Sequence, residues 1–158
     1  MRFLFLGFIT AALSWGNLSW ACPDAQMMAV AQYTATGDML TEGADFTVVA
    51  GGETDTGLCR NVGLSDAIYG HYFTTQPDVG FDLSSMDDFT MVLSVASDCD
   101  TMLMVLGASY FYYDDDDAGE LQPRIVMQRV PNGAMQVWVG TFEAVHCDAV
   151  LTLETLRR

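Results

Sequence analysis

The chain has 158 residues, of which 51% are hydrophobic and 17% are charged, and its formal net charge is -15. It is too apolar for a disordered tail and long enough for one domain with a core. The negative charge argues against binding to nucleic acid and to anionic membranes, and it suits divalent cations, basic partners or solubility alone.

Residues 1–21 predict a secretory signal peptide. A positive start is followed by an apolar run over residues 3–15, and Ser19 and Ala21 form a small-residue cleavage pattern. The run is short for a membrane-spanning helix, so we expect no stable membrane insertion. The protein is therefore expected to be secreted or periplasmic, with a mature chain that begins at Cys22. A lipid anchor on that cysteine is the alternative.

The cysteines predict two disulfide bonds, because an even number in an exported chain is typical of a disulfide framework. They are Cys22, Cys59, Cys99 and Cys147. Three pairings are possible. We expect Cys22–Cys59 and Cys99–Cys147, because the latter two each precede an apolar strand while the former two lie in the irregular amino-terminal part.

Most of the chain reads as short strands. Strands are expected in residues 46–52, 71–75, 80–84, 89–96, 101–107, 124–130, 134–142 and 149–154. Residues 89–96 alternate between the two faces, whereas residues 101–107 are apolar throughout, which is typical of a strand buried on both faces. Pro131-Asn132-Gly133 predicts a hairpin turn. The pattern favours an all-β fold, a jelly-roll-like antiparallel β-sandwich.

The expected organisation has three parts. The signal peptide (1–21) is followed by an N-terminal extension (22–39) and by one β-sandwich domain (40–158). The extension is expected to be short and irregular or helical, because residues 23–38 carry a helical pattern with Asp24 as a potential cap. The protein is expected to be a monomer.

Four aromatic residues, 110–113, run directly into four carboxylates. We expect the aromatic residues in a strand and the carboxylates on the loop that ends it. Carboxylates on a loop are the hard oxygen ligands that Ca²⁺ prefers, and a site of this kind would bind in the ~10⁻⁴–10⁻³ M range. A solvated acidic turn is the alternative. The candidate metal ligands are Asp114, Asp115, Asp116 and Asp117, with Asp100 as a weaker candidate.

Several segments, in order from about residue 40 to residue 154, resemble the bacterial pre-peptidase C-terminal domain. They are "FTVVAGGETDTGLC", "QPDVGFDLS", "DCDTMLMVLG", "YYDDDDAGELQPRI", "GAMQVWVGTF" and "AVLTLE". The resemblance implies a compact β-sandwich that accompanies secreted enzymes, and some relatives bind calcium or extracellular matrix polymers. Asp114 stands where the family often has Asn or Gly, so the paired aspartates could be Asp115-Asp116 or a neighbouring pair.

Catalysis has little support in the sequence. Short stand-alone relatives are sometimes labelled serine peptidases, but His71 and His146 are the only histidines and no Gly-x-Ser-x-Gly segment occurs. We therefore predict an exported non-catalytic binding or accessory module for another secreted protein or an extracellular polymer. A small secreted hydrolase is the alternative, and a calcium-regulated surface protein is a third reading. Trp138, Tyr110 and Tyr112 could form a polymer-binding face, or could simply pack on the sheet.

Overall fold

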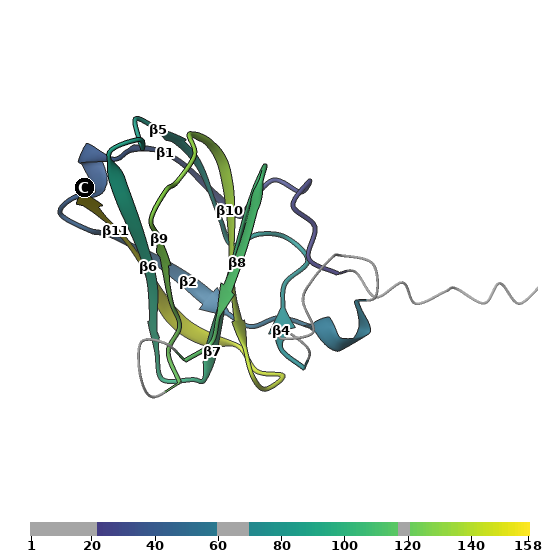
Figure 1. The fold of residues 1–158 in the computed structure, drawn as a ribbon. Helices are drawn as coiled ribbons and strands as arrows, with labels where there is room; N and C mark the ends of the chain where they lie inside the picture. The colour runs from purple at the N-terminus through teal and green to yellow at the C-terminus, as the bar shows by residue number, and fades with distance from the viewer. Residues whose placement is uncertain (1–21, 60–69, 117–120) are drawn as a thin grey trace, which may run out of the picture.

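The computed structural model describes residues 22–59, 70–116 and 121–158, so the predicted signal peptide and Asp117 lie outside the described residues. Within these ranges the strands form two sheets that pack as a sandwich (Figure 1). The seven-stranded sheet contains β1 (Ala31–Thr36), β3 (Thr54–Asp55), β4 (Tyr72–Phe73), β5 (Val79–Ser84), β7 (Thr101–Gly107), β8 (Tyr110–Asp114) and β10 (Gly133–Thr141). The four-stranded sheet contains β2 (Ala44–Ala50), β6 (Phe89–Ser97), β9 (Arg124–Met127) and β11 (Cys147–Arg157). Two short 3-10 turns, η1 (Asp38–Leu40) and η2 (Thr56–Leu58), complete the described elements.

Strand β10 organises the seven-stranded sheet. One of its edges pairs with β5 and then β4, and its other edge pairs with β7, which in turn pairs with β8. The four-stranded sheet has the order β2-β11-β6-β9 and is antiparallel throughout. The sandwich prediction is confirmed, with one parallel pair, β1 with β5, inside it. That pair is far apart in sequence and is not joined by a hairpin, so its direction is not fixed by a tight turn.

The main core lies between the sheets. Leu93 and Leu151 of the four-stranded sheet and Val105 and Val137 of the other are fully buried in one cluster. Burying an aliphatic side chain of this size contributes about 1.5–3 kcal/mol relative to exposure. The alternation predicted for residues 89–96 thus places their apolar face in this core.

A second, smaller cluster covers the outer face of the seven-stranded sheet. Phe73, Met102, Met104 and Trp138 are buried there, and Ala25 of the amino-terminal segment packs against them. Because β7 places Leu103 in the main core and its methionines in this cluster, the strand is buried on both faces, as its sequence predicted.

Two local predictions are wrong. The helical alternative for residues 23–38 fails, because residues 31–36 form the edge strand β1 and the segment before it is irregular. The Pro131-Asn132-Gly133 turn is not a hairpin, since β9 pairs with β6 in one sheet and β10 lies in the other. The turn instead carries the chain between sheets, where Asn132 Oδ1 accepts the Met86 N–H at 2.9 Å.

Both disulfides have the expected pairing. Cys22 is bonded to Cys59 with their Cα atoms 5.7 Å apart, and Cys99 is bonded to Cys147 with Cα atoms 6.3 Å apart. The second bond joins two places where the chain passes between sheets, the β6–β7 crossing and the β10–β11 crossing. The first ties the amino-terminal segment to the end of η2.

Removing the second disulfide should destabilise the domain. The double variant Cys99→Ser/Cys147→Ser frees two positions separated by 48 residues. A closed loop of that length lowers the entropy of the unfolded chain by the equivalent of about 4 kcal/mol at 25 °C. Urea denaturation under non-reducing conditions would measure the change, and an unfolding free energy equal to that of the unmodified chain would contradict it.

Candidate functional site

The two crossings joined by Cys99–Cys147 form a pocket of about 360 Å³, which we call the acidic pocket. Each crossing carries carboxylates and apolar groups to the same end of the sandwich. The residues that line the pocket are Asp98, Cys99, Asp100, Leu121, Phe142, Glu143 and Val145.

Hydrogen bonds hold the β6–β7 crossing in place. The Phe142 N–H donates to the Asp100 carbonyl at 3.1 Å, which joins the two crossings. The Gln122 side chain donates to the carbonyls of Cys99 at 3.0 Å and Ser97 at 3.2 Å, and its oxygen accepts the Ser97 N–H at 3.0 Å. The crossing therefore has a fixed conformation before any partner arrives.

The β10–β11 crossing is fixed by its own turn. The Thr141 hydroxyl, which is buried, donates to the Glu143 carbonyl at 2.7 Å and lies 3.2 Å from the Val145 carbonyl. The Val145 N–H also donates to the Glu143 carbonyl at 2.7 Å. This turn leaves the side chains of Phe142 and Glu143 exposed to solvent.

Like charges gather around Asp100. Partial burial raises the pKa of its carboxyl group, the nearby His71 opposes that rise, and the charges of Asp115, Asp116 and Glu143 add to it. The end of β8, with its aspartates, therefore lies close enough to the acidic pocket to act on it electrostatically. A cation at this end would relieve the repulsion.

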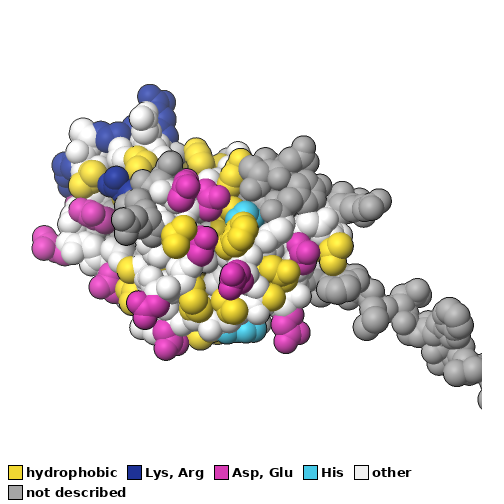
Figure 2. Space-filling view, turned by 90° about the horizontal axis from the view of Figure 1, so that it is seen from below, with side chains coloured by type: hydrophobic (Ala, Val, Ile, Leu, Met, Phe, Trp, Pro, Cys, Tyr) yellow, Lys and Arg dark blue, Asp and Glu magenta, His cyan; other side chains and the backbone are white. Residues whose placement is uncertain are grey.

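Apolar side chains are exposed among these carboxylates. Phe142 and Leu121 are each 55% exposed and Val145 is 38% exposed. Figure 2 shows the molecule from this end, with hydrophobic and acidic side chains intermingled and the basic side chains of the described residues gathered in one corner of the view. Exposed apolar groups that lie among polar ones are a common feature of surfaces that bind other proteins.

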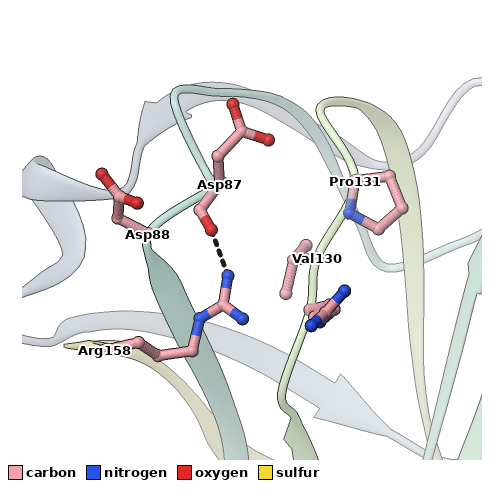
Figure 3. Close-up of a pocket in the computed structure, with 6 residues that line it drawn as sticks. Asp87, Asp88, Val130, Pro131 and Arg158 are labelled. Atoms are coloured by element: carbon pink, nitrogen blue, oxygen red, sulfur yellow. Dashed lines mark hydrogen bonds between the residues drawn. The ribbon is translucent and has the colours of Figure 1, made fainter.

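The opposite end of the sandwich is chemically different. Asp88 precedes β6 and Asp98 follows it, so about nine residues of strand, roughly 30 Å, separate the two ends. A pocket at the far end is lined by Asp87, Asp88, Arg129, Val130, Pro131 and Arg158. There the Arg158 guanidinium donates to the backbone carbonyl of Asp87, while the carboxylates of Asp87 and Asp88 point away from it (Figure 3).

The structure only partly assembles the predicted metal ligands. The Asp114 carboxylate ends β8 and accepts the Arg124 N–H at 2.7 Å, while Asp115 and Asp116 follow on an exposed bend near Asp100. Asp117 lies outside the described residues. In the described ranges, no group of three or more His, Cys, Asp or Glu side chains is arranged to hold a metal ion. Calcium binding stays a prediction.

The two histidines differ in their surroundings. His71 is buried, packs edge-on against Phe142 with ring centroids 5.7 Å apart, and leaves its Nδ1 atom without a hydrogen-bond partner. His146 is exposed on the β10–β11 crossing. Over residues 22–59, 70–116 and 121–158, neither ring is hydrogen-bonded to a serine, so the geometry offers no Ser–His pair.

The prediction that Trp138, Tyr110 and Tyr112 form a polymer-binding face is wrong. Trp138 is only 1% exposed, because it belongs to the cluster on the outer face of the seven-stranded sheet. Tyr110 packs against the main core on the opposite face, and burial raises its pKa to about 12. Tyr112 is the exposed member of the three, so no continuous aromatic surface forms.

Comparison with known proteins yields little. No family model matches the chain, so the resemblance to the pre-peptidase C-terminal domain stays a prediction, and no curated protein matches it. Among solved structures, the chain is similar to the periplasmic inhibitor of g-type lysozyme PliG from Aeromonas hydrophila, with 9% identity and a TM-score of 0.43. That match covers 80% of this chain and 99% of the other. None of the helices within the described residues has the length and apolar character needed to cross a membrane.

Sequence reasoning missed most of the acidic pocket. Asp98 and Asp100 were both noted as flanking Cys99, but only Asp100 was a candidate ligand, and neither Glu143 nor Phe142 was singled out. Asp98 and Glu143 are both within four residues of a cysteine of the same predicted disulfide, so the expected Cys99–Cys147 bond already implied that their carboxylates would meet. That signal was present in the sequence.

One further carboxylate is buried away from this pocket. Asp78 is 8% exposed, and its Oδ2 atom accepts the Val139 N–H at 2.7 Å, in the gap where β10 has left β5 and not yet reached β4. Burial raises the pKa of Asp78 to about 7, and the hydrogen bond from Val139 opposes that rise.

Asp78 should therefore make the domain less stable as pH rises. Because its pKa is higher in the folded state than in the unfolded state, its contribution is fully present below about pH 4 and is lost as pH rises to about 7. The loss is on the order of 2–4 kcal/mol, at about 1.4 kcal/mol per pKa unit. Denaturation of the unmodified chain and of Asp78→Asn at pH 5 and pH 8 would measure it. A difference between the two proteins that does not change with pH would contradict the assignment.

The calcium prediction has a direct test. If the aspartate run binds Ca²⁺, millimolar CaCl₂ should raise the melting midpoint by a few degrees more than MgCl₂ at matched ionic strength. Asp115→Asn/Asp116→Asn should abolish that preference, whereas Asp87→Asn/Asp88→Asn, at the other end of the sandwich, should keep it. If the two ions raised the melting midpoint equally, they would only be screening the negative charge, and the aspartate run would be a solvated acidic turn rather than a calcium site.

Proposed function

We propose that the chain is an exported, non-catalytic binding module that recognises a cationic surface of another secreted protein through the acidic pocket. The observation that carries the proposal is the combination of exposed apolar groups and carboxylates on one rigid end of a strongly negative molecule. The disulfides support the cellular setting, because such bonds form and persist in oxidising compartments outside the cytosol.

The charge of the chain supports a basic partner. A net charge of -15 would repel acidic proteins and attract basic ones over a distance of about one Debye length, and it would speed their association. In the pocket, an arginine or lysine side chain could reach Asp98, Asp100 and Glu143 while its methylene groups lie on Phe142. Charged and apolar contacts would then act on the same residue of the partner.

The rigid crossings support a binding role rather than a catalytic one. A module that only binds gains affinity from groups that are fixed in advance. The pocket carboxylates lie on turns that are held by the disulfide and by Gln122 and Thr141. In the described part of the chain neither histidine ring is hydrogen-bonded to a serine, and hydrolysis of the serine-peptidase kind would use such a pair.

The proposal is tested by capture with matched variants. The immobilised mature protein is incubated with the exported proteins of its own host, and the captured proteins are identified and ranked by their isoelectric point. We expect a basic protein to be enriched, with binding lost at high salt. Asp98→Asn/Asp100→Asn/Glu143→Gln should weaken its binding by at least tenfold, since each hydrogen bond between charged groups contributes about 1.5–3 kcal/mol.

The control variant is Asp87→Asn/Asp88→Asn, which removes two charges at the far end of the sandwich and should leave binding nearly unchanged. Equal weakening by both sets of changes would mean that only the net charge matters. Capture of an acidic protein, or binding that survives the triple change, would contradict the proposal.

A further inference from the structure

A groove lies between the edges of the two sheets, away from the acidic pocket. Strand β1 ends the seven-stranded sheet and β2 ends the four-stranded sheet, and both border the same pocket of about 380 Å³, which we call the edge groove. Its volume falls in the range of small-molecule sites. The residues that line it are Val30, Ala31, Tyr33, Phe46, Thr47, Val48, Val49, Thr74, Asp78, Val79 and His146.

The walls of the edge groove are apolar and partly aromatic. The rings of Tyr33 and Phe46 lie 4.7 Å apart, and Phe46 packs edge-on against the buried Phe81 at 5.1 Å. Val30 and Val49 are 73% and 52% exposed. Apolar groups left open between two sheet edges would gain free energy on being covered by an apolar body.

Asp78 is the acidic group of this groove, and within the described residues it forms no ion pair. Val139 N–H satisfies one of its oxygens, but none of the arginines in the described residues lines the groove. The one ion pair within the described ranges joins Arg157 to Asp38. A buried carboxylate that is ionised without a cation is costly, so a cation that enters the groove would be strongly favoured.

We propose that the edge groove binds a small primary amine that carries an apolar or aromatic body, with its ammonium group at Asp78. The body would lie against Tyr33 and Phe46, and the ammonium would donate to the carboxylate oxygen that Val139 does not use. Two observations select this class of ligand: the buried carboxylate favours a cation when it is ionised, and the apolar walls and limited volume favour a compact organic one. The site is separate from the proposed partner surface.

The test uses benzylamine as the probe, and benzyl alcohol, which has the same shape without the charge, as its control. Both are titrated into the ¹⁵N-labelled mature protein at pH 8 and followed by NMR. We expect benzylamine to shift the amide signals of residues 30–33, 46–49 and 146 with millimolar affinity, and benzyl alcohol to bind at least tenfold more weakly. Equal binding of the two compounds would overturn the proposal.

Matched variants separate the site from general charge attraction. Asp78→Asn keeps an oxygen that can accept the Val139 N–H but removes the charge, and it should weaken benzylamine binding at least tenfold. Asp82→Asn removes the charge of an exposed carboxylate on β5 that does not line the groove, and it should leave binding unchanged. Equal losses in both variants, or no loss in either, would overturn the proposal.

A pH series on the unmodified chain keeps the test independent of how the variants fold. Benzylamine stays protonated from pH 5.5 to pH 8, whereas Asp78, whose pKa is about 7, becomes largely ionised over this range. Affinity should therefore rise on the order of thirtyfold. His146 and Tyr33 are the other titratable groups that face the groove, so the series is repeated in His146→Gln. Affinity that does not depend on pH in both proteins would overturn the assignment to Asp78.

Discussion

The Cys99–Cys147 bond is the covalent constraint that links the two sheets at the end of the sandwich where the proposed site lies. It joins the β6–β7 crossing, which carries Asp98 and Asp100, to the β10–β11 crossing, which carries Glu143. The charge of Glu143 adds to the rise in the pKa of Asp100, and none of the arginines in the described residues lines the pocket. A covalent bond holds the crossings together where weak contacts would let them separate. The exposed carboxylates are thus compatible with a fixed pocket.

The distribution of charge follows from the lengths of the strands. Since β6 and β10 each span nine residues, the side chains on the turns at one end of the sandwich are too far away to contact those at the other end. At one end, Arg129 and Arg158 share a pocket with Asp87 and Asp88, so the formal charges there cancel, whereas Asp98, Asp100 and Glu143 line the pocket at the other end without an arginine. A basic partner that approaches by diffusion would be oriented towards the acidic end before contact. The apolar groups there would then make the short-range contacts.

The positions of strands and their buried faces could be predicted from the sequence, because they depend on periodicity and composition. Which strands pair with each other could not be predicted, because pairing depends on residues far away in the chain. The alternation in residues 89–96 and the continuous apolar run in 101–107 identified β6 and β7 with their buried faces. The turn at Pro131–Gly133 has hairpin chemistry, but whether its flanking strands pair is decided by β6 and β7, which compete for them. Asp78 precedes an apolar strand and looks like a solvated turn residue. In the structure it is buried, because its carboxylate accepts the Val139 N–H in the gap of the β10 ladder.

The β10–β11 crossing connects the two proposed sites. Phe142, Glu143 and Val145 line the acidic pocket, and His146 lines the edge groove. The segment packs directly on Gly51, which has a φ of +96°. A Cβ atom at this position would lie 2.1 Å from the Val145 carbonyl oxygen, so only glycine allows this contact. The segment is also fixed by Thr141 at one end and by Cys147 at the other. Because this short segment is held at both ends and packs closely on Gly51, the wall that it contributes to the acidic pocket has its shape before binding, and a partner does not have to spend binding energy on ordering it.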